Sequence, residues 1–209
     1  MQVSEGNTPF ISVYDNHLKK LKTLSIEEGI PSIKEGNAAF VHCVQLVLIP
    51  KYSMLLTVLS DHSLCFWYNM AYLVYAGRLT RAGWLPHCAC WSASLGKVII
   101  GSRDGKIIVA DPIRRRTDHC LTYHDDTVLD IVAVEEFEAV VTSGMDRKLI
   151  LWDIHSWHMK TTFQGHSSII VPLVWAPQMS VIFGAGKDEI VFAWSPTSSN
   201  PIMRIMGPR

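Results

Sequence analysis

The sequence predicts an all-β protein built from repeated small antiparallel sheets, and three observations support this prediction. The 209 residues are 48% hydrophobic and 18% charged, a balance typical of a chain that folds around a core. Short runs of Val, Ile, Leu and Thr alternate with Gly, Asp, Pro and Ser, which is the pattern of strands and turns. The same pattern recurs at a fixed interval along the chain, which indicates a repeated structural unit.

Four aspartates mark this interval, and each stands six residues before a tryptophan or, once, an alanine. Neighbouring aspartates are 42 or 43 residues apart. The four pairs are Asp61 with Trp67, Asp104 with Ala110, Asp146 with Trp152, and Asp188 with Trp194. A period of this length that holds four strand-like runs indicates one small four-stranded sheet per repeat.

The four strands of a repeat are clearest in the last two units. They are predicted over 127–134, 139–143, 148–152 and 159–163, and again over 169–175, 181–183, 190–194 and 202–205. Several of these strands are apolar on both faces, as a sheet must be when it lies between two other sheets. Small antiparallel sheets stacked in this way around an axis are the blades of a β-propeller.

The residues around Trp152 resemble the signature of the WD-repeat (WD40-type) propeller family. Leu151, Trp152 and Asp153 follow the turn residue Asp146 and precede Gly165 and His166. The resemblance implies that a His, a Ser or Thr, the turn Asp and the Trp form a hydrogen-bonded tie within each blade. The residues at these positions are His124, Thr142, Asp146 and Trp152 in the third full unit, His166, Asp188 and Trp194 in the fourth, and Thr57, Asp61 and Trp67 in the first.

These ties differ from unit to unit. Gly184 takes the hydroxyl position in the fourth unit, and Ala39 takes the His position in the first. The second unit keeps only Asp104, so we expect apolar packing to hold it together. Trp152 should therefore matter more for stability than any residue of the second unit.

We expect one partial propeller over residues 1–209, with about four and a half blades and no closure of the ring. Strands over 10–15 and 20–24 are expected to be the third and fourth strands of an incomplete blade. The predicted segments are a partial blade 1–24, a loop 25–37, and blades 38–80, 81–123, 124–164 and 165–209. An open arrangement would expose two apolar blade faces, so we expect association through them. We expect such a chain to be a fragment, an alternative transcript or a gene model cut from a longer chain.

The residues give little support to nucleic-acid, metal or membrane functions. Basic and acidic residues number 19 each, so no net field draws the chain to a polyanion, and Arg114–Arg116 is interpreted as an exposed hairpin. Cys88 and Cys90 lack a second ligand pair and are interpreted as strand residues, so neither metal nor cofactor is expected. The apolar stretches 38–50 and 64–77 are shorter than the ~18 residues of a membrane span. Five scattered cysteines favour a reducing compartment, which predicts an intracellular, cytoplasmic protein and leaves the nucleus open.

The family resemblance implies a scaffold that binds protein or peptide partners and has no catalytic residue. In this family partners dock where the loops between blades meet the turns that carry the Asp. The residues expected on that face are Arg81, Arg103, Asp125, Asp126, Met145, Ser167, Ser168 and Lys187. Trp84 and Trp157 lie outside the repeat positions, so they are freer to be exposed than the repeat tryptophans, and tryptophan is a frequent interface anchor. Two alternatives stay open: a propeller-based hydrolase or metal enzyme with Asp130 as a channel carboxylate, and a fragment without a function of its own.

Overall fold

The computed structural model describes residues 10–14, 20–25, 43–69, 72–77 and 85–206 of the chain. Within these residues there are four four-stranded antiparallel sheets and one two-stranded sheet. The chain divides into two compact units, Met1–Arg81 and Ala82–Arg209. The predicted class, all-β with four-stranded antiparallel blades, is confirmed.

The first unit contains two of these sheets. In the two-stranded sheet, β1 (Phe10–Tyr14) pairs with β2 (Lys20–Ser25), close to the strands predicted over 10–15 and 20–24. The four-stranded sheet runs in chain order through β3 (Cys43–Ile49), β4 (Met54–Leu59), β5 (Leu64–Tyr68) and β6 (Tyr72–Gly77). Apart from Ser25, the predicted loop 25–37 lies outside the described residues.

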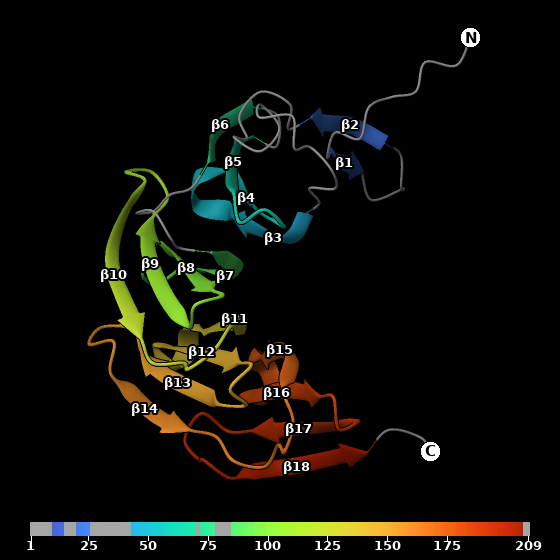
Figure 1. Ribbon diagram of the computed structural model, residues 1–209, viewed down its shortest axis with the longest axis vertical. Helices are drawn as coiled ribbons and strands as arrows, with labels where there is room; N and C mark the ends of the chain where they lie inside the picture. The colour runs from blue at the N-terminus through green and yellow to red at the C-terminus, as the bar shows by residue number, and fades with distance from the viewer. Residues whose placement is uncertain (1–9, 15–19, 26–42, 70–71, 78–84, 207–209) are drawn as a thin grey trace. The chain divides into compact units, whose positions relative to one another are not determined.

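The second unit contains three four-stranded sheets that lie side by side in chain order (Figure 1). The first has strands β7 (Pro86–Ser92), β8 (Lys97–Ser102), β9 (Lys106–Asp111) and β10 (Arg116–Thr122). The second has β11 (Val128–Val134), β12 (Ala139–Gly144), β13 (Leu149–Asp153) and β14 (Met159–Thr162). The third has β15 (Ile170–Ala176), β16 (Val181–Gly186), β17 (Ile190–Trp194) and β18 (Pro201–Met206).

The sequence repeat is also a repeat of backbone conformation. Each turn aspartate is followed by a residue in the left-handed region, which closes the turn between the second and third strands of its sheet. The aspartate side chain supports the turn, as Asp146 does by accepting the N–H of Lys148 at 3.1 Å. The left-handed residues are His62 (φ 66°), Gly105 (φ 77°), Arg147 (φ 64°) and Glu189 (φ 60°).

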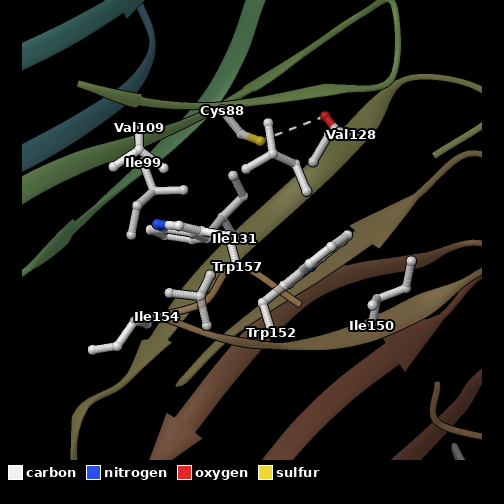
Figure 2. Close-up of a cluster of buried hydrophobic side chains, with 11 residues drawn as sticks. Cys88, Ile99, Val109, Val128, Ile131, Ile150, Trp152, Ile154 and Trp157 are labelled. Atoms are coloured by element: carbon white, nitrogen blue, oxygen red, sulfur yellow. Dashed lines mark hydrogen bonds between the residues drawn. The ribbon is translucent and has the colours of Figure 1, made fainter. Parts of the chain in front are cut away.

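Two apolar clusters join the three sheets of the second unit. The first apolar cluster lies between the β7–β10 and β11–β14 sheets (Figure 2) and includes Ile99, Ile107, Val109, Ile131, Ile150 and Trp152. The second apolar cluster lies between the β11–β14 and β15–β18 sheets and includes Val141, Leu149, Leu151, Phe163, Leu173, Phe192 and Trp194. The middle sheet is therefore buried on both faces, as its doubly apolar strands predict.

Trp157, which the sequence leaves free to be exposed, is buried, because only 8% of it is exposed. The carboxylate of Asp153 accepts the N–H groups of His155 and Ser156 and folds the β13–β14 turn back on itself. Trp157 then has a φ of 55°, and its indole lies in the first apolar cluster (Figure 2). Trp84, the other such tryptophan, lies outside the described residues.

Candidate functional site

The four side chains that the resemblance links in the unit 124–164 form one chain of hydrogen bonds. The Trp152 Nε1–H donates to Thr142 Oγ1 at 2.9 Å. Thr142 Oγ1 lies 2.8 Å from His124 Nε2, and His124 Nδ1 lies 3.0 Å from each carboxylate oxygen of Asp146. Because the carboxylate only accepts, Nδ1 carries the proton and Nε2 accepts from the threonine hydroxyl. A neutral imidazole therefore satisfies every group in the chain.

Burial sets the charge states at this tie. The side chain of His124 is completely buried, and desolvation lowers its pKa although the hydrogen bond to Asp146 acts in the opposite direction. Burial also raises the pKa of Asp146, but hydrogen bonds from His124, Lys148 N and Asp125 N outweigh it and leave this pKa below its usual range. Asp146 is therefore ionised at neutral pH beside a neutral histidine.

We expect the stability of the second unit to fall as the pH is lowered from 7 towards 5, through His124. The folded state keeps this imidazole neutral, whereas the unfolded chain takes up a proton near the ordinary histidine pKa of about 6.5. The unfolded state therefore binds more protons as the pH falls, and the contribution is fully present only above that pKa. Urea unfolding of the wild type and of His124→Gln, at about pH 7.5 and about pH 5.5, measures the effect.

The free energy of unfolding should change less between the two pH values in His124→Gln than in the wild type. His158→Gln, at an exposed position, serves as the control and should keep the wild-type pH dependence. The same pH dependence in His124→Gln and in the wild type would contradict a neutral, buried His124.

The predicted tie of the fourth unit uses backbone groups where Gly184 offers no hydroxyl. The Trp194 Nε1–H donates to the carbonyl oxygen of Gln164 at 2.7 Å. His166 Nε2 lies 3.2 Å from the Gly184 carbonyl oxygen, and its Nδ1 lies 3.3 Å from the Asp188 carboxylate. Both of these partners are hydrogen-bond acceptors, unlike the threonine hydroxyl of the preceding unit, which can also donate.

The tie of the repeat 38–80 has fewer members, because the sequence has Ala39 at the histidine position. Trp67 Nε1 donates to Thr57 Oγ1 at 3.4 Å, and Asp61 accepts hydrogen bonds from the backbone N–H and the hydroxyl of Ser63. In the repeat 81–123, Ile100 stands where the threonine would be and is completely buried. This repeat is therefore built around apolar side chains at this position, in keeping with its sequence.

The predicted partner-binding residues of the second unit lie at one end of its sheets. The strands of each sheet are antiparallel and follow one another in chain order, so the loops that enter and leave a sheet lie at the same end as the turn between its second and third strands. Thr127 Oγ1 donates to the Arg103 carbonyl oxygen at 3.1 Å, and the Met145 N–H donates to the Thr127 carbonyl oxygen at 2.8 Å. We call this end the turn face and define it by Arg103, Asp125, Asp126, Met145, Ser167, Ser168 and Lys187. Arg81, also predicted here, lies outside the described residues.

The turn face combines apolar and charged side chains. Met145 is 47% exposed in its turn. Beside it Asp125 and Lys148 form an ion pair at 2.5 Å, and the Ser167 hydroxyl donates to Asp188 at 3.3 Å. A surface that combines an exposed apolar side chain with charges of both signs matches a protein partner better than a polyanion such as a nucleic acid.

One exposed residue of this region was not predicted from the sequence. Tyr123 lies in the loop between β10 and β11 and is exposed, and its ring packs against Trp152 in a T-shaped arrangement at a centroid distance of 5.4 Å. An aromatic residue directly before the tie histidine was the available signal. Tyr123 therefore connects the turn face to the tie of its unit.

Two carboxylates that bond across sheet boundaries were also not predicted in this role. The Asp130 carboxylate accepts the backbone N–H of Leu173 at 2.8 Å and the backbone N–H of the next residue, Ile131, at 2.9 Å. Burial raises the pKa of Asp130, and these two hydrogen bonds act against that rise. Glu135 accepts the N–H groups of Ala93 and Ser94 at 2.6 and 3.1 Å. Both side chains therefore hold neighbouring sheets together.

Metal and membrane features were also sought in the described part of the chain. There, no group of three or more His, Cys, Asp or Glu side chains is arranged to hold a metal ion. No helix in the same residues is long and apolar enough to cross a membrane. Cys88 is buried in β7, as expected, and its thiol donates to the Val128 carbonyl oxygen at 3.5 Å (Figure 2). The Arg114–Arg116 hairpin is exposed, and Arg116 pairs with Asp118 at 3.1 Å.

No model of a known protein family matches this chain. Cilia- and flagella-associated protein 337 B of Tetrahymena thermophila is 24% identical over 124 residues, which is 58% of this chain and 10% of that protein. WD repeat-containing protein 97 of Homo sapiens is 27% identical over 71 residues, which is 34% of this chain and 4% of that protein. Protein FIZZY-RELATED 3 of Arabidopsis thaliana is 25% identical over 134 residues, which is 62% of this chain and 26% of that protein. The chain thus spans only a small part of each relative.

Among solved structures, a chain in a crystal structure of the mitotic checkpoint complex has a similar fold. The TM-score is 0.68 at 17% identity, and the match covers 80% of this chain and 53% of that chain. At this identity the likeness concerns the fold alone.

Proposed function

Because this chain belongs to the WD-repeat propeller proteins, we propose that it is a scaffold that binds protein or peptide partners and catalyses no reaction. The turn face is the observation that carries this proposal. There Met145 is exposed among charged side chains on turns that hydrogen bonds hold in place. Loops positioned by a rigid scaffold are the usual site of binding. Association through uncovered sheet faces is a second way in which the chain could meet a partner.

The relatives and the cysteines support this proposal and an intracellular location, cytoplasmic or nuclear. One relative is named for its association with cilia and flagella, and the solved structure is a component of a complex. The cysteines are free thiols, which suits a reducing compartment. They are Cys43, Cys65, Cys88, Cys90 and Cys120.

The geometry of Asp130 argues against the enzyme alternative. Each of its carboxylate oxygens accepts a backbone N–H, so its use as an acid or a base would disturb the boundary between two sheets. Turnover of a small ester, glycoside or phosphate by the purified chain, lost in Asp130→Asn, would overturn the scaffold proposal.

We expect partner binding to depend on the turn face and not on the opposite end of the sheets. A photo-crosslinking amino acid at Met145 of the full chain should form adducts with a partner in a cell extract. The same amino acid at Met179 is the matched control, because Met179 is 58% exposed in the turn between β15 and β16, at the opposite end. Only the first position should give a specific adduct.

The purified partner should then bind the double variant Met145→Ala/Asp126→Ala at least about tenfold more weakly than the wild type, because truncated interface anchors commonly cost that much. Met179→Ala should bind like the wild type. Equal affinity for the double variant and the wild type would exclude the turn face as the binding site. No specific adduct from any turn-face position would count against the scaffold itself.

A further inference from the structure

One position of the repeat gives three consecutive sheets of the second unit an exposed side chain on the turn face. It is the residue directly before the turn aspartate, and it is Arg103, Met145 and Lys187 at intervals of 42 residues. The backbone N–H of each donates to the carbonyl oxygen of the residue directly before the first strand of its own sheet, at 2.8, 2.8 and 3.2 Å. The three side chains therefore occupy equivalent places in three neighbouring sheets.

Thr127 joins the turns of Arg103 and Met145. Its hydroxyl donates to the Arg103 carbonyl oxygen, and its own carbonyl oxygen accepts the Met145 N–H. The counterpart of Thr127 in the next repeat is Ile169, which has no hydroxyl to bind Met145 in this way. Arg147 lies in the same turn as Met145. A short ligand can therefore contact both arginines and the methionine together.

The two arginines of this group have no partner of their own. Within the residues that the structure describes, neither Arg103 nor Arg147 forms a side-chain hydrogen bond or an ion pair, and both are exposed. A guanidinium group offers several N–H donors in a planar fork that matches a carboxylate. The turn face therefore presents two free guanidinium groups beside the exposed side chain of Met145.

Three nearby carboxylates are already engaged by groups of their own turns and loops. Two of them form ion pairs with lysines, Asp104 with Lys106 and Asp125 with Lys148. The third, Asp146, is only 6% exposed and accepts the hydrogen bonds of its tie. These acids therefore offer little to a ligand, whereas the two arginines offer all of their side-chain donors.

Two other acids of this end keep a free oxygen, and they limit what the ligand can be. Asp126 uses one oxygen to accept the Thr127 N–H at 2.6 Å. Glu189 is exposed in the turn of Lys187 and has no partner among the described residues. A long polyanion such as a nucleic acid would meet both of these charges. A short segment centred on Met145 avoids Glu189.

We propose that the turn face binds a short peptide segment of a partner protein in which acidic residues flank an apolar residue. The apolar side chain contacts Met145, and the flanking carboxylates accept charge-assisted hydrogen bonds from Arg103 and Arg147. The free oxygen of Asp126 accepts a backbone N–H of the segment. This proposal rests on the turn face as the binding site and adds the chemistry of the partner.

Selection from a library of random displayed peptides on the immobilised full chain tests the proposal. The enriched peptides should share acidic residues around an apolar one. Selection on the double variant Arg103→Glu/Arg147→Glu should enrich basic residues in their place, because the charge at the site is reversed. Both arginines are exposed, so the double variant should keep the wild-type circular dichroism spectrum.

The affinity of one enriched peptide, measured by fluorescence anisotropy, then tests each arginine. Arg103→Ala and Arg147→Ala should each weaken binding by about tenfold, because each change removes charge-assisted hydrogen bonds. Arg114→Ala is the matched control, since Arg114 is exposed in the turn between β9 and β10, at the opposite end of the sheets. This variant should bind the peptide like the wild type.

The outcomes separate this proposal from the scaffold proposal. Enriched peptides that lack acidic residues but lose binding in Met145→Ala would overturn the acidic segment and leave the turn face as the binding site. A selection that enriches no peptide, or peptides whose binding ignores Met145 and both arginines, would count against the turn face as well. Arg103-dependent binding of a single-stranded oligonucleotide, with no acidic peptide enriched, would assign these cations to a polyanion and sink the proposal.

Discussion

Trp152→Ala is expected to lower the free energy of unfolding of the second unit by about 3–5 kcal/mol. The indole is buried in the first apolar cluster between Ile131 and Ile150, so its removal leaves a cavity between two sheets (Figure 2). It also removes the donor at the start of the hydrogen-bonded chain, because Trp152 Nε1 donates to Thr142. Urea unfolding followed by circular dichroism measures the loss.

Asp104→Ala is the matched comparison in the second full unit. Asp104 occupies the turn position of Asp146, but it pairs with the partly exposed Lys106, and the sequence has Ala82 where the tie histidine would stand. Exposed ion pairs of this kind contribute little to stability, so the loss should be far smaller than for Trp152→Ala. Equal losses for the two variants would contradict the unequal ties predicted from the sequence.

Gly184→Thr, which restores the hydroxyl residue of the family pattern, is expected to destabilise the second unit by about 1–3 kcal/mol. A Cβ at position 184 would lie 2.7 Å from Cγ2 of Ile170 and 3.0 Å from Cζ3 of Trp194. Both neighbours are buried, so neither can move aside easily. The Trp194 indole already donates to the Gln164 carbonyl oxygen, so the added hydroxyl would gain no equivalent of the Thr142 bond.

The reciprocal change, Thr142→Gly, should also destabilise the second unit, because it removes the central member of the hydrogen-bonded chain. Thermal unfolding of both variants beside the wild type compares them directly. A melting temperature of Gly184→Thr at or above that of the wild type would show that the fourth unit accepts the family residue, against this prediction.

The strands were predictable where the repeat marks both of their ends. The strand Ile190–Trp194 matches its prediction, because the turn aspartate precedes it and the tie tryptophan ends it. The preceding strand was predicted over 181–183 and extends to Gly186. Gly184, Ala185 and Gly186 have little strand propensity of their own, and hydrogen bonding to β15 and β17 on either side holds them in the sheet.

The candidate site was predictable where one repeat contains all of its members. The tie of His124, Thr142, Asp146 and Trp152 lies within one unit, so its positions follow from the motif. Contacts between repeats left no such pattern. Glu135 binds a loop about 42 residues earlier, but the equivalent position in the next repeat is Pro177, which has no carboxylate.

The repeat 81–123, which has no histidine tie, is stabilised by contacts with the repeat that follows it, 124–164. The Glu135 carboxylate binds its Ala93–Ser94 turn, Thr127 binds the Arg103 carbonyl oxygen, and the Cys88 thiol donates to Val128. Gly105 lies directly against the His124 carbonyl, where no larger residue would fit. We therefore expect the β7–β10 sheet to open whenever the β11–β14 sheet opens, whereas fraying of β10 alone should leave the β11–β14 sheet intact.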